Sequence, residues 1–255
     1  MIEVEYYRRV AERTVGRTIR EVVAPDAWFL KGTTAAVLRA ALHGVSITGT
    51  RRIGKLLLLD TDGATLGLRF GMTGRLLLDG VGPIEKLEYA SGRDDPAWMR
   101  FALRFVERGE LQLVDPRRLG GVVLDPGVAH LGTDALSVTP ARLRDALQGS
   151  RAPLKAWLLD QGRVAGLGNL LVDEILWRAG IDPARPARSL DPAEAKVLHR
   201  HLVGTVRRLM DRGGSHTGEL QVARVRGATC PRDGTPLQRR TIGGRTTYSC
   251  PLHQR

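Results

Sequence analysis

The sequence predicts an α+β chain of several domains: a β-sandwich with flanking helices, a helical domain, and a small metal-binding hairpin at the C-terminus. Short β-prone segments separated by turn residues fill residues 18–115, and helical periodicity runs from residue 139 to residue 212. Two pairs of metal-ligating residues flank a predicted hairpin near the C-terminus. We therefore expect domains at residues 1–128, 129–222 and 223–255.

The N-terminal part opens with helical spacing over residues 3–15, where Val4, Tyr7, Val10 and Ala11 can share one face. Turn residues then separate short segments of strand composition. We predict a helix at Thr34–Leu42 and strands at Thr18–Val23, Val45–Arg52, Lys55–Asp60, Thr65–Phe70, Arg100–Phe105 and Glu110–Val114. Many short strands of this kind favour an antiparallel sandwich or barrel.

The second part is helical, with Pro and Gly at its joints. Thr139-Pro140 opens one helix, and further helices are expected at Leu154–Asp160 and Asn169–Ala179. The last helix starts at Asp191-Pro192-Ala193-Glu194, because Asp is a good cap, Pro fits the first helical position, and Glu fits the third. Gly213-Gly214 ends this helix.

The C-terminal segment reads as a strand, a Gly243-Gly244 turn and a second strand over residues 238–248. Two residues separate the members of each ligand pair, and sixteen separate the pairs, which are Cys230 with Asp233 and Cys250 with His253. Zinc accepts sulfur, nitrogen and oxygen ligands in a tetrahedron, so the four side chains predict one structural zinc ion. Two alternatives are a hairpin without metal and a disulfide between the two cysteines.

The composition is strongly basic, with 39 Lys plus Arg against 27 Asp plus Glu and a formal charge of +12. Most of the excess is arginine, whose planar guanidinium binds phosphate well and favours a nucleic-acid partner. High-GC codon usage is the alternative source of the arginines. No apolar run approaches the ~20 residues that span a bilayer, and no signal peptide is evident. We therefore expect a cytoplasmic protein that has no membrane association.

Four short strings carry a resemblance to a known family: Arg69-Phe-Gly-Met72-Thr-Gly74, Asp115-Pro-Arg117-Arg118-Leu119-Gly120, Gly166-Leu-Gly168-Asn169 and Glu219-Leu-Gln-Val. Together with the hairpin, and in this order, they resemble the formamidopyrimidine-DNA glycosylase and endonuclease VIII family of base-excision repair proteins. The resemblance implies a helix–two-turn–helix domain, a zinc-finger hairpin, and a monomeric, nucleoid-associated glycosylase with AP lyase activity. Its partner would be damaged double-stranded DNA with a flipped nucleotide.

The resemblance also implies roles for single residues. Asn169 would hold the phosphate at the lesion, Arg245 would contact phosphates beside it, and Lys55 would lie near the same phosphates. Met72 and Arg117 match two of the three residues that fill the space left by the flipped nucleotide. The third is often Phe and is Leu119 in this chain, which can still wedge apolar bulk between bases but stacks less well.

The N-terminus departs from the family. Relatives begin close to Met-Pro-Glu-Leu-Pro-Glu-Val-Glu, and the Pro amine exposed by methionine removal attacks the sugar. This chain begins Met1-Ile2-Glu3-Val4-Glu5. Either Glu3-Val4-Glu5 matches the later Glu-Val-Glu, so that the Pro-Glu pair is missing, or Ile2-Glu3 stands in its place. Because Ile2 is not small, Met1 is expected to stay; a start codon further upstream is the other possibility.

Three hypotheses follow for the function. The chain is a glycosylase with a substitute catalyst, in which Glu3 or Glu5 activates water or Lys55 or the Met1 amine is the nucleophile. It is alternatively a non-catalytic protein that recognises lesions or distortions, or a non-specific basic DNA-binding protein. The sequence does not identify the lesion, although the short segment at residues 213–224 favours an open, permissive pocket.

Overall fold

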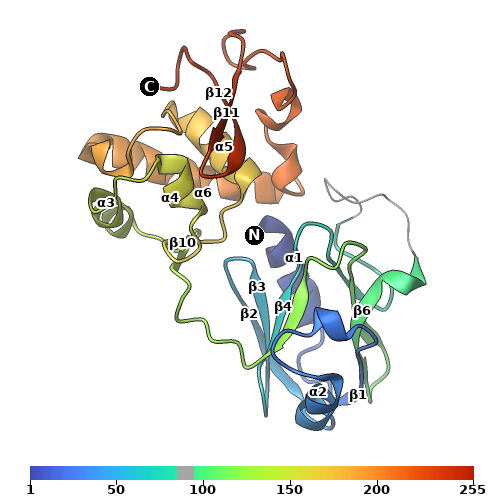
Figure 1. Cartoon of the computed structure of the whole chain (residues 1–255). Helices are drawn as coiled ribbons and strands as arrows, with labels where there is room; N and C mark the ends of the chain where they lie inside the picture. The colour runs from blue at the N-terminus through green and yellow to red at the C-terminus, as the bar shows by residue number, and fades with distance from the viewer. Residues whose placement is uncertain (85–94) are drawn as a thin grey trace. The chain divides into compact units, whose positions relative to one another are not determined.

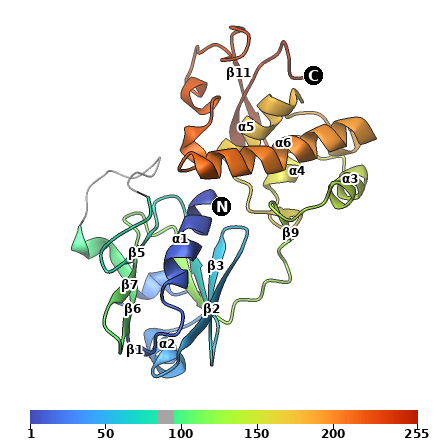
Figure 2. The ribbon, with the colours of Figure 1, turned by 180° about the vertical axis from the view of Figure 1, so that it is seen from behind.

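The computed structural model of the chain describes residues 1–84 and 95–255. The chain forms two compact units, one of residues Glu3–Val128 and one of Ala129–Arg255 together with Met1–Ile2 (Figures 1 and 2). The expected fold class is confirmed: a β domain with flanking helices precedes a helical domain that carries a C-terminal β-hairpin. None of the described helices is both long and apolar enough to cross a membrane.

The first unit contains two four-stranded sheets in which all neighbouring strands are antiparallel. One sheet has the order β1 (Ile19–Val23), β6 (Met99–Phe105), β7 (Glu110–Val114), β5 (Arg75–Leu78). The other has the order β2 (Ile47–Ile53), β3 (Leu56–Thr61), β4 (Leu66–Arg69), β8 (Gly121–Leu124). All six strands predicted with residue ranges are present, while no range was predicted for β5 or β8.

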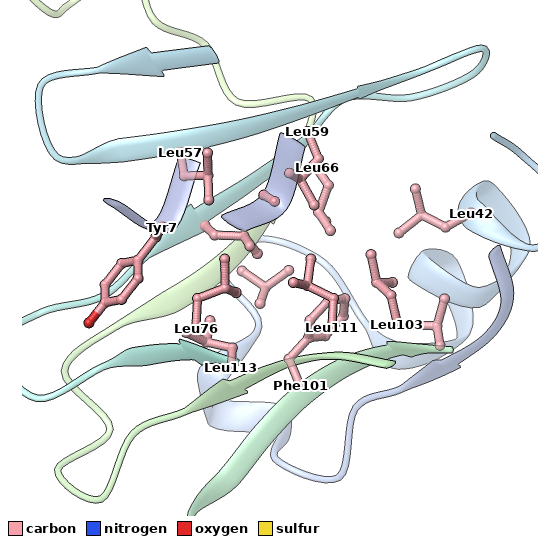
Figure 3. Packing of buried hydrophobic residues seen from close by; sticks show 14 of the residues in the cluster. Tyr7, Leu42, Leu57, Leu59, Leu66, Leu76, Phe101, Leu103, Leu111 and Leu113 are labelled. Carbon is pink, nitrogen blue, oxygen red and sulfur yellow. The ribbon is translucent and has the colours of Figure 1, made fainter. Parts of the chain in front are cut away.

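Side chains from the two sheets face each other and form one apolar core, so the unit is a sandwich (Figure 3). Leu57, Leu59 and Leu66 project from one sheet toward residues such as Phe101 and Leu113 of the other. The helices α1 (Ile2–Glu12) and α2 (Ala35–Leu42) pack at the ends of this core. Burial of apolar area supplies the main driving force for such an arrangement.

Tyr7 links helix α1 to the loop that follows β4. Its ring is buried and lies 4.5 Å from the Phe70 ring, centroid to centroid, and its hydroxyl donates a 3.0 Å hydrogen bond to the Gly74 carbonyl. Burial, and then the negative charge of Glu3, raise the pKa of the Tyr7 hydroxyl. The hydroxyl therefore stays protonated and acts as a donor near neutral pH.

The second unit is built from α3 (Pro140–Gln148), α4 (Leu154–Leu159), α5 (Asn169–Ala179) and α6 (Pro192–Asp211), with a short parallel pair of β9 (Thr133–Asp134) and β10 (Val164–Ala165). The predicted helix starts are confirmed. Thr139 caps α3 through its side chain, and Asp191 and Glu194 form a reciprocal capping box at the start of α6. Two single 3-10 turns, η4 (Ser215–Thr217) and η5 (Gln221–Ala223), follow α6.

The C-terminal hairpin consists of β11 (Gln238–Ile242) and β12 (Arg245–Ser249), as predicted. Gly243 and Gly244 have φ angles of 58° and 71°, which a two-residue hairpin turn requires. A Cβ on Gly243 would lie 2.8 Å from the Cβ of Ala156, so the tip of the hairpin lies directly against α4. Only glycine allows this close approach of the turn to the helix.

Candidate functional site

Met72 and Leu119 lie on two neighbouring turns of the first unit. Both are apolar yet exposed, with 46% and 49% of their surface accessible. A Cβ on Gly71, whose φ is 58°, would lie 2.6 Å from the Cβ of Leu119, so the two turns touch. The structure thus brings together two residues that the sequence placed far apart, and Arg117 is also exposed on the second turn.

The buried carboxylate of Asp115 connects these turns. Its Oδ1 accepts a 2.6 Å hydrogen bond from the Thr73 hydroxyl and a 3.1 Å bond from the Arg117 backbone N–H. Its Oδ2 accepts a 2.8 Å bond from the Gly120 N–H. Charge-assisted bonds of this kind hold both turns in one geometry. In the sequence, the position of Asp115 directly after a predicted strand is the signal for this role.

Lys55 occupies the turn between β2 and β3, next to Gly54, whose φ is 60°. The Lys55 side chain is exposed. The arginines just before this turn are engaged in ion pairs: Arg51 with Asp60 at 2.7 Å and Arg52 with Glu5 at 3.2 Å.

Glu5 and Glu3 lie on α1 in different surroundings. The carboxylate of Glu5 is 15% exposed and is shared by Arg8 at 3.0 Å, Arg52 at 3.2 Å and Arg9 at 3.6 Å. Glu5 is therefore a bridge between α1 and β2. Glu3 is half-buried, and its charge acts on the Tyr7 hydroxyl.

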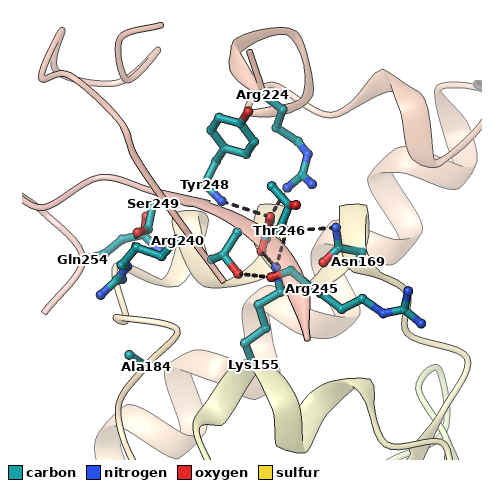
Figure 4. Close-up of polar contacts among 12 residues, drawn as sticks. Lys155, Asn169, Ala184, Arg224, Arg240, Arg245, Thr246, Tyr248, Ser249 and Gln254 are labelled. Atoms are coloured by element: carbon teal, nitrogen blue, oxygen red, sulfur yellow. Dashed lines mark hydrogen bonds and ion pairs between the residues drawn. The ribbon is translucent and has the colours of Figure 1, made fainter. Parts of the chain in front are cut away.

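In the second unit, Asn169 and the hairpin meet at one backbone carbonyl (Figure 4). The Asn169 side-chain N–H donates a 3.1 Å hydrogen bond to the Thr246 carbonyl, and Lys155 Nζ donates a 3.0 Å bond to the same oxygen. Asn169 is the first residue of α5, after a Gly168 cap that makes no side-chain bond, so its amide is not used as a helix cap. Arg245, adjacent to Thr246, is exposed.

Behind this junction lies a buried charge cluster that sequence reasoning missed. Lys155 Nζ is 2.6 Å from Asp173 Oδ1, and both side chains are fully buried. Asp173 also holds Arg224 and accepts a 3.3 Å hydrogen bond from the Tyr248 N–H of β12. Burial, and then the positive charges of Arg224 and Arg245, lower the pKa of Lys155 to about 7.

Glu174, the neighbour of Asp173 on α5, fixes the segment after α6. Its carboxylate accepts hydrogen bonds from the backbone N–H groups of Glu219 at 3.1 Å and Leu220 at 2.8 Å, and it pairs with Arg178 at 2.8 Å. A Cβ on Gly218 would lie 2.7 Å from a Glu174 oxygen. Two acidic residues on the otherwise apolar stretch of α5 were the signal in the sequence for buried polar partners.

The predicted metal ligands converge at the base of the hairpin. One ligand atom from each of Cys230, Asp233, Cys250 and His253 lies within 4.8 Å of the others. His253 Nδ1 is 2.7 Å from Asp233 Oδ2, and Cys250 Sγ is 3.4 Å from the same oxygen. Both cysteines are free, so the disulfide alternative is wrong. The donor set and its spacing fit a single zinc ion.

The surroundings orient these ligands. His253 Nε2 lies 3.2 Å from the Trp177 carbonyl, which can accept the ring N–H of Nε2 when Nδ1 binds a metal. The Trp177 indole N–H donates to Cys230 Sγ at 3.2 Å. The backbone N–H of Thr235, and then His253, hold the pKa of the Asp233 carboxyl well below its usual range. All three features favour the metal-binding forms of the side chains.

Comparison with known proteins agrees with this architecture. Residues 1–122 match the formamidopyrimidine-DNA glycosylase N-terminal domain, and residues 131–220 match the formamidopyrimidine-DNA glycosylase H2TH domain. The formamidopyrimidine-DNA glycosylase of Symbiobacterium thermophilum is 34% identical over 99% of this chain and 88% of its own length. The enzyme of Salinispora arenicola is 34% identical over 99% of this chain and 94% of its own length.

Solved structures give the same result. The complex between the Lactococcus lactis Fpg and an abasic site containing DNA aligns with a TM-score of 0.83 and 27% identity, covering 100% of this chain and 99% of that one. MutM in complex with carbocyclic 8-oxo-G containing DNA aligns with a TM-score of 0.82 and 27% identity at the same coverage. On these matches, which span both units, the chain belongs to the formamidopyrimidine-DNA glycosylase family.

Proposed function

We propose that this chain is a DNA repair glycosylase that binds damaged duplex DNA and holds one nucleotide outside the helix. The observation that carries the proposal is the pair of exposed apolar side chains, Met72 and Leu119, on two turns fixed by the buried Asp115. Exposed apolar side chains on a rigid support are suited to occupy the space of a flipped nucleotide, because flipping costs a few kcal/mol of stacking and pairing. Arg117 beside them supplies a guanidinium to the same space.

Phosphate binding is assigned to Asn169, Arg245 and Lys55. The first N–H groups of α5 are not used by a side-chain cap, and a helix N-terminus attracts phosphate. Arg245 adds a full positive charge at the same junction, while Lys55 stands exposed on its hairpin turn. The net charge of +12 supports binding to a polyanion. Each of these assignments is a proposal that mutation can test.

We assign catalysis to residues other than an N-terminal Pro-Glu pair. Glu3 and Glu5 are the two candidates for activating water, and the carboxylate of Glu5 is shared among Arg8, Arg9 and Arg52. Amine catalysis by Lys55 or by the Met1 amine is the competing route, in which the amine attacks the sugar carbon, displaces the base and forms a Schiff base. The two routes leave different products and can be separated.

Incubation with duplex DNA that contains an oxidised purine or an abasic site, followed by borohydride, decides between these routes. A trapped covalent adduct, mapped by mass spectrometry to Lys55 or to the N-terminus, establishes amine catalysis. Base release with no adduct, abolished in Glu3→Gln, establishes water activation. Tight binding with no release of any base would instead establish the second candidate function, a lesion-recognising protein without excision.

The hairpin is proposed to hold one structural zinc ion through Cys230, Asp233, Cys250 and His253. Zinc would fix the hairpin, whose tip touches α4 and whose Thr246 carbonyl accepts a hydrogen bond from the Asn169 side chain. Metal analysis of the purified protein and of Asp233→Ala tests the ligand set. One zinc per chain in the parent protein and a reduced content in the variant are expected; an unchanged content would remove Asp233 from the set.

A further inference from the structure

A hollow on the first unit lies between strand β1 and the C-terminal end of α2, and it has no role in the function proposed so far. Its volume is about 420 Å³, within the ~300–1,000 Å³ typical of small-ligand sites. Its described lining consists of Arg20, Glu21, Val22, Arg39, Ala40 and His43. Two guanidinium groups and an imidazole face one carboxylate in this lining, so its composition favours an anion.

A β-bulge adds Arg20 to the lining. In the register of β1 with β6, Ile19 is opposite Phe105 and Glu21 is opposite Arg104. Arg20 is therefore an extra residue with no partner on β6. Arg20 and Glu21 are both exposed, although successive residues of a regular strand point to opposite faces. Bulges often re-aim a side chain in this way, and they are frequent beside functional sites.

The two side chains from α2 are held by the backbone of β1, which is an edge strand of its sheet. The Arg39 Nε–H donates a 3.2 Å hydrogen bond to the Val22 carbonyl, and His43 Nδ1 donates a 2.7 Å bond to the Arg20 carbonyl. These bonds cover carbonyl groups at the edge of the sheet. They also fix the guanidinium and the imidazole in advance, which lowers the cost of binding a ligand.

The guanidinium groups of this hollow lack counter-charges. Among residues 1–84 and 95–255, Arg20 and Arg39 form no ion pair, and the Nη groups of Arg39 donate no hydrogen bond. The carboxylate in the lining, Glu21, is paired with Arg104 at 3.0 Å. A concave surface that carries charge of one sign concentrates counter-ions, so a bound anion would relieve the repulsion between the two guanidinium groups.

A terminal phosphate group matches these donors in charge and shape. It carries a charge of about −1.5 to −2 at pH 7 and three acceptor oxygens, which suit two guanidinium forks. We propose that this hollow binds a terminal phosphate group through Arg20 and Arg39. The His43 ring adds a third donor when both of its nitrogens are protonated. A free nucleotide and the phosphorylated end of a nucleic-acid strand both carry such a group.

The site is separate from the function proposed above. Its lining includes none of the wedge residues, none of the residues assigned to the lesion phosphates and none of the zinc ligands. Substitutions in the hollow should therefore leave the affinity for lesion-containing duplex DNA unchanged.

Calorimetric titration with inorganic phosphate and with a nucleoside 5′-monophosphate tests the site, with the unphosphorylated nucleoside as the reference ligand. We expect the parent protein to bind both phosphate ligands and not the nucleoside. Arg20→Ala and Arg39→Ala should each weaken phosphate binding at least about tenfold, the effect of losing a charge-assisted hydrogen bond. Arg20→Ala is the safer variant for folding, because it keeps the carbonyl that holds His43. The control, Arg13→Ala, removes the same charge from another exposed position of the first unit.

A second measurement identifies the source of the phosphate. A short single-stranded oligonucleotide is compared with the same oligonucleotide carrying a 5′-phosphate, by fluorescence anisotropy. Tighter binding of the phosphorylated strand by the parent protein, lost in Arg20→Ala, would assign the hollow to strand ends. Equal binding of the two strands, together with the calorimetric effect, would assign it to a free nucleotide.

Equal affinities of the parent protein and both variants for the phosphate ligands would overturn the site, as would no binding of these ligands by the parent protein. A loss of the same size in Arg13→Ala would also overturn it, because net charge alone would then explain the effect. Equal losses by Arg20→Ala for the nucleotide and for an unphosphorylated lesion-containing duplex would overturn it too, since the hollow would then serve the DNA backbone. Failure of the parent protein to bind that duplex would contradict only the proposed function. Thermal unfolding of each variant verifies that the fold is intact.

Discussion

Lys155 and Asp173 form a fully buried ion pair, 2.6 Å from Nζ to Oδ1, beneath the junction of α5 and the hairpin. Asp173 also binds Arg224 and the backbone of Tyr248, so one carboxylate balances two cations. Buried pairs contribute little net stability when intact, but removal of the shared partner leaves charges without compensation. Substitution of Asp173 should therefore destabilise the fold more than substitution of Lys155.

Asp173→Asn is expected to lower the free energy of unfolding by about 3–5 kcal/mol, because Lys155 and Arg224 then remain buried without a counter-charge. Lys155→Met should cost less, since Arg224 still pairs with Asp173. Chemical denaturation of both variants measures the difference, with the exposed Lys196→Met as a control. A smaller loss in Asp173→Asn than in Lys155→Met would contradict the shared-carboxylate interpretation.

Asn169→Ala and Arg245→Ala are each expected to weaken DNA binding without loss of folding. A charge-assisted bond to phosphate contributes roughly 1.5–3 kcal/mol, or about a 10- to 150-fold change in Kd. Arg245→Ala should also reduce the dependence of binding on salt by about one phosphate contact. Fluorescence anisotropy at several salt concentrations measures both effects. Arg144→Ala, which removes the same charge from α3, is the control and should change neither the Kd nor its salt dependence appreciably.

Met72→Ala and Leu119→Ala are expected to reduce excision from paired duplex DNA much more than from a lesion in single-stranded DNA. The wedge side chains compensate for the base pair and stacking that flipping breaks, and an unpaired lesion needs no such compensation. Single-turnover excision on the two substrates gives the ratio. Equal losses on both substrates would show that these residues act on the chemistry or on the fold instead.

Trp177→Phe is expected to weaken zinc binding about 10- to 100-fold, the usual effect of losing a partner that orients a metal ligand. The variant keeps an apolar ring but loses the N–H that donates to Cys230 Sγ. Competition with a chromogenic chelator measures the affinity, and Trp98→Phe in the first unit is the control. An unchanged affinity would mean that the indole N–H does not influence the thiolate.

Much of the fold could be predicted because its elements have strong local signals. The cap at Asp191 and the two glycines at the hairpin turn define their elements without help from tertiary contacts. The strand β8 was missed because it has only four residues and opens at Gly121. Such short strands are determined by their neighbours in the sheet rather than by their own residues.

In the candidate site, too, some features could be predicted from the sequence and others could not. Ligand spacing at the hairpin predicted a cluster that the structure assembles. The ion pair between Lys155 and Asp173 has no such signal. Lys155 lies within an apolar stretch of α4, and Asp173 belongs to another helix, α5. The same holds for Asp115 and its distant partner Thr73, which lies on another turn of the first unit. Long-range polar contacts of this kind require the assembled fold.

Within its own turn, Asp115 binds the backbone and not the side chains that the turn displays. On that turn its carboxylate binds the backbone N–H groups of Arg117 and Gly120, which every amino acid except proline can supply. The scaffold therefore does not depend on which side chain the turn displays at position 119. Evolution, or an engineer, can therefore exchange the proposed wedge residue there, as Leu for Phe, without rebuilding the loop.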